Sequence, residues 1–211
     1  MNQFHTLLDL ETAIHFLVAI ELRFGPVHRH YGTPSLRRTS ASLESLLSII
    51  TDQFLSLQAG TAIWARLNER LGEVTCETVL GCRQEELVSL GLSRAKAKCF
   101  HGCATAGIDF NKLVDIAPDL IREKLLTIWG VGPWTVDIFL LTAIAGADAW
   151  PVGDLALQVA VQNLFSLKQR PDAKKMEIIA EPWRPYRAAA ARLLWAHYRG
   201  IKGLVQAPSQ N

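Results

Sequence analysis

Asp154 follows a short turn that begins at Pro151, and an apolar pattern of helical period starts directly after it. The sequence therefore places this carboxylate at or near a helix N-cap, where free N–H groups and the helix dipole favour a negative charge. An isolated aspartate in such a place is most often a helix cap and nothing more. A fixed anion could also stabilise the positive charge that develops on a sugar as a glycosidic bond breaks, and could orient or deprotonate an attacking water.

A glycine-rich turn lies upstream of Asp154, where Gly130-Val131-Gly132-Pro133 separates two apolar helical patterns. Both glycines can adopt a positive φ and let another backbone approach without a Cβ in the way. Pro133 suits the first position of a helix, where its missing N–H costs nothing. The turn would then present amide N–H groups at the positive end of a helix, which is a site for a phosphate oxygen. An ordinary αα-hairpin turn is the alternative.

The motif Leu-x-x-Ile-x-Gly-Val-Gly-Pro-Trp-Thr, followed by Asp154, resembles the helix-hairpin-helix of the DNA glycosylase superfamily. The resemblance implies that Asp154 is the catalytic residue. It implies DNA contacts from four residues of the turn and the helix after it, which are Gly130, Val131, Gly132 and Thr135. It also implies that three main-chain carbonyls hold a monovalent cation, Na⁺ or K⁺, bridging to phosphate: those of Leu126, Ile128 and Val131.

Position 134 distinguishes the reaction subtypes within this superfamily. Members that also cut the DNA backbone carry a lysine two residues after the second hairpin glycine, and that amine forms a Schiff base with the sugar. This chain has Trp134 there, which is similar to the alkylpurine branch, 3-methyladenine DNA glycosylase II, and implies hydrolysis without strand cleavage. An indole face would suit an alkylated, cationic purine. A core aromatic at a helix start is the alternative for Trp134.

A second match is the segment Ile49-Ile50-Thr51-Asp52-Gln53-Phe54-Leu55-Ser56, which resembles the family's Ile-Ile-x-x-Gln-Gln-Val-Ser. In the family, a side chain of this segment enters the DNA stack. Base flipping leaves a hole in the duplex that a planar apolar side chain can fill. We therefore predict Phe54 as the wedge and Gln53 as a polar contact beside it. Since Phe54 is also in phase with the apolar stripe from Leu43 to Ile50, a core position is the alternative.

The C-terminal part carries Trp183-Arg184-Pro185-Tyr186-Arg187 and Leu193-Leu194-Trp195, which resemble the ending of the family. The resemblance implies that Trp195 lines the base pocket; a buried helix aromatic is the alternative. The branch pattern has a tyrosine four residues after the hairpin tryptophan, but this chain has Ile138. The pocket therefore offers fewer aromatic faces, which leaves its lesion range open. The helical pattern begins within about ten residues of Met1, so the amino-terminal sheet domain of longer members is missing from the pattern.

The elements that must position these residues are helical throughout. The apolar residues Leu43, Leu46, Leu47 and Ile50 recur at helical spacing, and Ser42 offers an N-cap. The segment 25–38 is the longest irregular connection expected, and no stretch alternates as a strand would. We predict an all-α fold with a DNA-binding cleft between two helical lobes of a single domain, 1–211. One lobe spans about 30–115, and the other about 116–211 together with 1–29.

Composition limits the remaining function classes. The net charge of +2 is too small to indicate nucleic-acid binding by itself, so a DNA contact requires local basic groups such as Arg94, Lys96 and Lys98. We expect no signal peptide, no membrane span and a cytoplasmic location, with the protein near the nucleoid if it is bacterial. The four cysteines fit free thiols, and their spacing fits neither zinc nor the family's iron–sulfur loop.

Together these patterns predict a monomeric, monofunctional DNA glycosylase of base excision repair, with damaged duplex DNA as its partner and no organic cofactor. The predicted reaction is the flipping of an alkylated purine and hydrolysis of its bond to deoxyribose, which leaves an abasic site. Three alternatives remain. The same fold could act on deaminated or oxidised bases, the hairpin could serve only to grip DNA, or the chain could be a helical scaffold without a DNA role.

Overall fold

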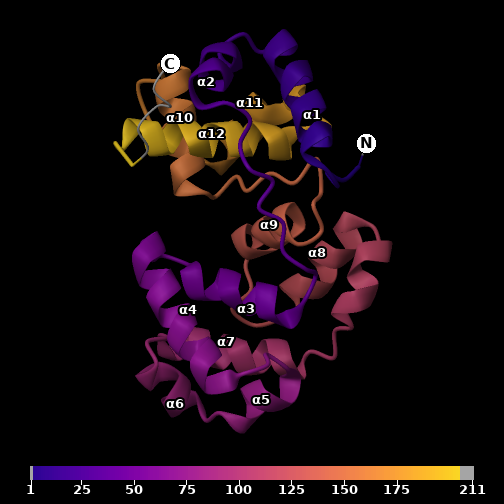
Figure 1. The fold of residues 1–211 in the computed structure, drawn as a ribbon, viewed down its shortest axis with the longest axis vertical. Helices are drawn as coiled ribbons and strands as arrows, with labels where there is room; N and C mark the ends of the chain where they lie inside the picture. Colours follow the sequence, from indigo (N-terminus) through magenta and orange to yellow (C-terminus); the bar gives the residue numbers. More distant parts are fainter. Residues whose placement is uncertain (1, 205–211) are drawn as a thin grey trace. The chain divides into compact units, whose positions relative to one another are not determined.

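The computed structural model describes residues 2–204, which form two compact units (Figure 1). Residues 39–144 make one of them, the inserted unit. The other, the split unit, joins the stretch up to Arg38 with the stretch from Ala145 onward. Across residues 2–204 no strand forms, and the one β-bridge pairs Gln3 with Gly146. The predicted all-α class is confirmed.

The inserted unit is built from short helices whose bounds are α3 (Leu43–Asp52), α4 (Leu57–Leu71), α5 (Cys76–Gly81), α6 (Gln84–Ser89), α7 (Arg94–Thr105), the 3-10 turn η1 (Phe110–Asp115), α8 (Pro118–Leu126) and α9 (Pro133–Thr142). The Ser42 hydroxyl accepts from the Ser45 amide, so the predicted N-cap of α3 is confirmed. Ser93 caps α7 in the same way. The apolar faces of α3, α7 and α9 supply the core, with Ile50, Phe100 and Phe139 fully buried.

The boundary between the units differs from the one predicted near residue 115. It falls between Ile144 and Ala145, so the whole 116–144 segment belongs to the inserted unit. The reason is that α9 packs against both α8 and α3. The helical period of α9 marked it correctly as a helix, but a period alone does not say which partner covers the buried face.

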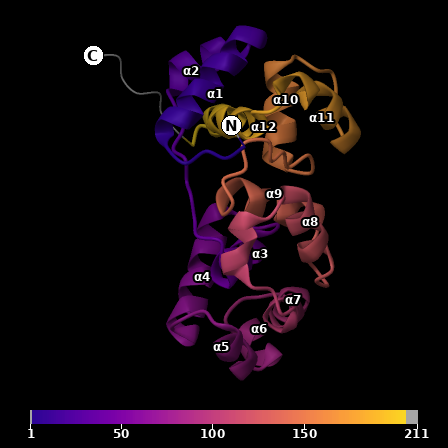
Figure 2. The ribbon, with the colours of Figure 1, turned by 90° about the vertical axis from the view of Figure 1, so that its right-hand side faces the viewer.

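The split unit contains α1 (Leu7–Ile20), α2 (Phe24–Tyr31), α10 (Leu155–Leu164), α11 (Ala173–Ala180), the 3-10 turn η2 (Glu181–Trp183) and α12 (Arg187–Ile201). Figure 2 shows α12, in yellow, in the middle of this unit, with α1 and α2 on one side and α10 and α11 on the other. The run Ala188–Ala191 is fully buried. Because these side chains are small, neighbouring helices can approach α12 closely.

Helix α2 occupies part of the segment 25–38 that was expected to be irregular. Pro26 stands in the first turn of α2, where its missing N–H leaves no helix bond unmade, and Gly32 ends the helix with a φ of 68°. The irregular stretch therefore begins at Gly32 and continues to Ser42, after which α3 begins. It is tied to α12 by the guanidinium of Arg192, whose Nη2 donates to the Leu36 carbonyl at 3.0 Å. Burial lowers the pKa of Arg192 to about 10.

Candidate functional site

The α8–α9 turn is closed by a hydrogen bond from the Val131 amide to the Ile128 carbonyl, at 3.1 Å. Gly130 has a φ of 87°, and a Cβ built on it would lie 3.0 Å from both the Cβ and the Sγ of Cys99 on α7. Both the backbone angle and the close approach of α7 therefore require glycine at this position.

Gly132 is a different case. Its φ is −103°, so the ability of glycine to adopt a positive φ is not used there: the residue is the extended N-cap of α9. A Cβ at this position would meet nothing within 4 Å. Nothing in the chain itself excludes a side chain here, and the glycine leaves that side of the turn open to an approaching group. Pro133 is the first residue of α9, as predicted.

The carbonyl groups expected to bind a monovalent cation belong to Leu126, at the end of α8, and to Ile128 and Val131 in the turn. Oxygen donors of this kind suit Na⁺ or K⁺ by their hardness. The Ile128 carbonyl already accepts from Val131, and a carbonyl oxygen keeps a second lone pair. The donor chemistry is therefore compatible with a cation.

Trp134 and Ile138 lie one turn apart on α9. From Trp134 to Thr142 this helix is buried except at three positions, Trp134, Ile138 and Thr142. Their i, i+4, i+8 spacing puts them on one stripe of the helix. Trp134 is half-buried on this stripe and is not part of the fully buried core. Beyond Pro133, the accessible side chains of α9 are consequently those of this stripe.

The segment after α3 presents Phe54 to solvent. Its side chain is 104% exposed and its φ is 56°, so the alternative of a core position is wrong. The neighbouring Gln53 turns the other way, and its Nε2 donates to the Thr135 hydroxyl at 2.6 Å. Thr135 was expected to contact DNA, but the whole residue is only 1% exposed and its hydroxyl accepts this bond. The structure therefore places the Thr135 side chain inside the inserted unit.

Asp154 is the N-cap of α10, as the sequence predicted. Its Oδ1 accepts two hydrogen bonds, from the Leu157 amide at 2.9 Å and from the indole Nε1 of Trp195 at 3.2 Å. Trp195 reaches it from α12 and is half-buried. The structure therefore joins two of the predicted site residues, 41 positions apart in the chain, and their donors fix one oxygen of the carboxylate.

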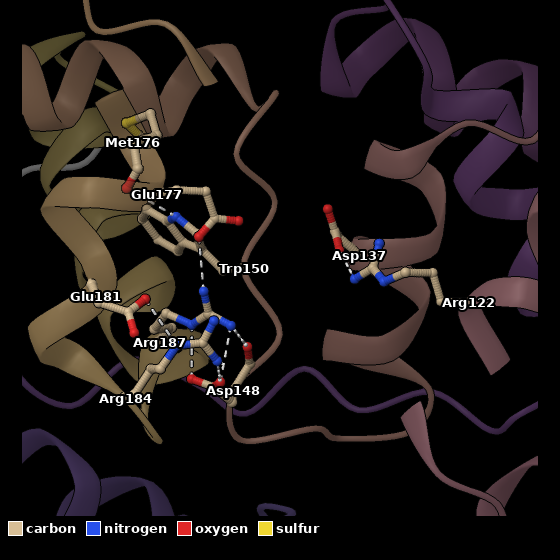
Figure 3. A network of polar contacts seen from close by, with 9 residues as sticks. All are labelled: Arg122, Asp137, Asp148, Trp150, Met176, Glu177, Glu181, Arg184 and Arg187. Carbon is tan, nitrogen blue, oxygen red and sulfur yellow. Dashed lines mark hydrogen bonds and ion pairs between the residues drawn. The ribbon is translucent and has the colours of Figure 1, made fainter. Parts of the chain in front are cut away.

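A polar network that sequence reasoning missed anchors the segment leading to Asp154 (Figure 3). Arg187 is nearly buried, and its Nε and Nη2 donate to the two carboxylate oxygens of Asp148 at 2.8 and 2.9 Å. Its Nη1 reaches Glu177 at 3.0 Å, and Arg184 also bonds Asp148. Asp148 and Arg187 are 39 residues apart, so no local pattern could have paired them.

A second missed ion pair lies within the hairpin. Asp137 of α9 is 4% exposed and accepts from Arg122 of α8, which ties the two hairpin helices together (Figure 3). The signal for it was present in the sequence. A carboxylate inside an otherwise apolar helix requires a cation or donors when it is buried.

The four cysteines are free thiols. Cys99 and Cys103 hydrogen-bond to each other on α7, and this bond lowers the pKa of Cys99 and, with burial, raises that of Cys103. Within the described chain, no three His, Cys, Asp or Glu side chains gather as a metal site would require. No described helix combines the length and apolar character needed to cross a membrane.

Comparison with known proteins places these features in context. Residues 47–185 match the family described as HhH-GPD superfamily base excision DNA repair protein. The putative DNA-3-methyladenine glycosylase YfjP of Bacillus subtilis is 28% identical over 178 residues, which cover 79% of this chain and 62% of that protein. The alkylbase DNA glycosidase-like protein mag2 of Schizosaccharomyces pombe is 25% identical over 164 residues, covering 74% of this chain and 77% of the relative.

A solved structure has the same fold. It is the 3-methyladenine DNA glycosylase Mag1 of Schizosaccharomyces pombe in complex with abasic DNA, with a TM-score of 0.80 and 22% identity. The match covers 90% of this chain and 97% of that one. The chain spans about 62% of the length of its Bacillus relative.

Proposed function

Because this chain belongs to the HhH-GPD superfamily of base excision DNA repair proteins, we propose that it is a monofunctional DNA glycosylase for alkylated purines of the 3-methyladenine type. It would flip the damaged nucleotide out of duplex DNA, hydrolyse the bond between base and deoxyribose, and leave an abasic site. The names of the two relatives and of the Mag1 structure support the substrate class. The observation that carries the proposal is the fixed carboxylate of Asp154.

Asp154 is the catalytic residue in this proposal. When the glycosidic bond breaks, its electron pair leaves with the base and positive charge develops on the sugar. A carboxylate held by the Leu157 amide and the Trp195 indole does not have to reorganise as that charge forms. Water then adds to C1′, and its proton passes to Asp154 or to solvent. An alkylated purine is already cationic, so its departure requires no strong general acid.

Trp134 and Ile138 form one wall of the proposed base pocket, since they share the accessible stripe of α9. A cationic purine is attracted to the face of an indole. The position that carries the Schiff-base lysine in strand-cutting members is occupied here by Trp134, which has no amine. The product is therefore an abasic site in an uncut strand.

The α8–α9 turn would hold the DNA backbone. The N-terminus of α9 lies at this turn, and the positive end of the helix dipole there suits a phosphate oxygen. Gly132 leaves room for that oxygen, because no atom of the chain occupies the space where its Cβ would stand. A Na⁺ or K⁺ ion on the carbonyls of Leu126, Ile128 and Val131 would add positive charge beside the same phosphate. We place the protein on chromosomal DNA, as a cytoplasmic monomer without an organic cofactor.

The test is base release from methylated duplex DNA by the wild type and by Asp154→Asn. Asp172→Asn is the matched control, because Asp172 caps α11 with the same geometry, accepting from the Lys175 amide at 2.8 Å. We expect the wild type and Asp172→Asn to release 3-methyladenine or 7-methylguanine without nicking, and Asp154→Asn to be slower by about a thousandfold.

Three other results would be informative. Equal activity of the two Asn variants would reduce Asp154 to a helix cap. A wild type that binds duplex DNA but releases no alkylated base would overturn the alkylpurine assignment. Release of deaminated or oxidised bases instead would keep the chemistry and change the substrate.

A further inference from the structure

The backbone of the turn that carries Phe54 is hydrogen-bonded to the side chain of Lys96. The ammonium of Lys96 donates to two main-chain carbonyls at the end of α3, that of Thr51 at 2.8 Å and that of Gln53 at 2.7 Å. The last carbonyls of a helix have no partner within it, and a lysine can satisfy them. Lys96 thus binds the residue before Phe54 and the helix end that precedes it.

The backbone of Lys96 is itself fixed by a hydrogen bond at the start of α7. It is the third residue of α7, and its amide donates to the Ser93 hydroxyl that caps this helix. Its side chain is half-buried, and burial lowers the pKa of Lys96 while the nearby Asp52 opposes that change. Burying an ammonium is unfavourable unless it finds acceptors. The two carbonyls supply them, so the contact is a fixed feature of the inserted unit.

Phe54 requires such support. Its φ of 56° lies in the left-handed region, which costs a residue with a Cβ about 1 kcal/mol or more. Its side chain packs on nothing that would compensate, since it is 104% exposed. The conformation is held by its neighbours: Lys96 on one carbonyl, Gln53 through its bond to Thr135, and the Leu55 amide on the Asp52 carbonyl at 3.2 Å.

We infer that Lys96 is a positioning residue for DNA opening, which holds the 51–55 turn so that Phe54 projects rigidly and can fill the space left by a flipped nucleotide. The inference rests on the proposed function. It assigns to Lys96 a role through Phe54 and no direct contact with DNA. A preformed wedge does not lose conformational freedom when it inserts, so insertion is favoured relative to a mobile turn.

The first experiment measures insertion without base release. Tryptophan is placed at the tip by Phe54→Trp, and its fluorescence is followed as the protein binds duplex DNA containing a tetrahydrofuran abasic analogue. Titration of the Phe54 protein gives the background of the other tryptophans. Stacking of the tip residue should quench its emission, and adding Lys96→Met should reduce the inserted population about tenfold.

Lys112→Met is the matched control, because Lys112 is an exposed lysine on η1 of the same unit and its ammonium pairs with Asp109. It should leave the quench unchanged. Lys96→Arg keeps a cation with several donors and should restore part of the quench. The inference would be overturned if the tip tryptophan were fully quenched in the Lys96→Met protein. It would also be overturned if that tryptophan were not quenched when Lys96 is present. Should Lys96→Met fail to fold, hydrogen exchange at the Leu55 amide of the wild type decides, because an unprotected amide would show that the turn is not held.

The second experiment is a double-mutant cycle on single-turnover base release from methylated duplex DNA. Lys96→Met and Phe54→Ala should each slow release, and the double variant should be no slower than Phe54→Ala alone, because the lysine acts through the aromatic ring. On single-stranded substrate, where no stack has to be opened, Lys96→Met should match the wild type. Additive losses, or an equal loss on both substrates, would show a merely structural lysine. A wild type that releases no base from either substrate contradicts the proposed function instead, and the fluorescence result then stands by itself.

Discussion

The indole Nε1 of Trp195 donates a hydrogen bond of 3.2 Å to Oδ1 of Asp154, the same oxygen that caps α10. A tryptophan of α12 therefore sets the direction of a carboxylate on another helix. This relationship gives Trp195 a task beyond lining a base pocket, and the two roles have different kinetic consequences.

Trp195→Phe removes the indole donor and keeps an aromatic ring. If the main role of Trp195 is to hold Asp154, the single-turnover rate should fall about tenfold while KM for methylated DNA changes little. Trp150→Phe is the control, because it removes another indole hydrogen bond of the same unit, to the Met176 carbonyl at 3.4 Å. A higher KM with an unchanged rate in Trp195→Phe would instead identify a pocket wall.

The two hairpin glycines should separate folding from DNA binding. Gly130→Ala has to adopt a φ of 87° and lies against Cys99, so we expect a loss of about 1–3 kcal/mol in the free energy of unfolding. Gly132→Ala meets no atom and keeps an ordinary φ, so its stability should change by less than about 0.5 kcal/mol while its affinity for duplex DNA falls. Urea unfolding and fluorescence anisotropy measure the two quantities. An equal stability loss in both variants would contradict this distinction.

Arg187 and Arg184 both pair with Asp148, and the contribution of each ion pair to stability should depend on how deeply the arginine is buried. Arg187 has a side chain only 9% exposed and a two-pronged contact with Asp148, which lysine cannot reproduce. Arg187→Lys should lower the free energy of unfolding by about 2–4 kcal/mol. Arg184 bonds the same Asp148 from a half-exposed position, so Arg184→Lys should cost under about 1 kcal/mol. Similar losses from the two substitutions, measured by urea unfolding, would argue against this ranking.

The ammonium of Lys98 lies 4.1 Å from the centre of the Trp129 ring, and Trp129 directly precedes Gly130 of the hairpin. We expect Lys98 to meet the DNA phosphate next to the turn. Lys98→Ala should then reduce the slope of log K against log salt for duplex binding by about 0.9. Lys112→Ala serves as the control, since Lys112 is exposed and paired with Asp109 on η1. An unchanged slope in Lys98→Ala would place this lysine away from the DNA.

Stability should decrease on mild acidification because of two histidines. Burial lowers the pKa of His28, with the neighbouring His15 as a further cause, and burial lowers the pKa of His197. A folded-state pKa below the unfolded value means that the unfolded chain binds the proton more readily, so stability is lost as pH falls below about 6.5. The double variant His28→Gln/His197→Gln should flatten this dependence, and exposed His30→Gln should not. A wild type whose Tm is constant from pH 7 to pH 5 would refute the expectation.

Local signals predicted the local parts of this molecule. The Ser42 cap, Pro133 at the start of α9 and Asp154 at the start of α10 were all readable, because each depends on a few adjacent residues. Phe54 was in phase with an apolar stripe, but the left-handed φ at that residue turns it outward. The helical spacing of apolar residues does not reveal that the backbone changes conformation at the last residue of the pattern.

The remaining errors concern relations between distant parts of the chain. The unit boundary was misplaced because α9 packs on α3, and the Asp148–Arg187 pair joins segments without any shared pattern. Gln53 was predicted as a polar contact beside Phe54, and no local pattern indicated that its side-chain amide would bond to Thr135, 82 residues away. The sequence supplied the helices and the reactive groups, while tertiary packing decided which of them face inward.

The split unit is assembled from two chain segments with the whole inserted unit between them. During synthesis α1 and α2 leave the ribosome first, but α12, on which they pack, follows only after residues 39–144 have been made. At typical elongation rates this interval lasts roughly ten seconds. The inserted unit can fold as soon as it emerges from the ribosome. The apolar faces of α1 and α2 stay exposed to solvent until α12 has been made. Nascent chains stalled after residues 39–144 have left the ribosome exit tunnel, but before α12 is made, should therefore hold a native inserted unit and an N-terminal segment that binds chaperones.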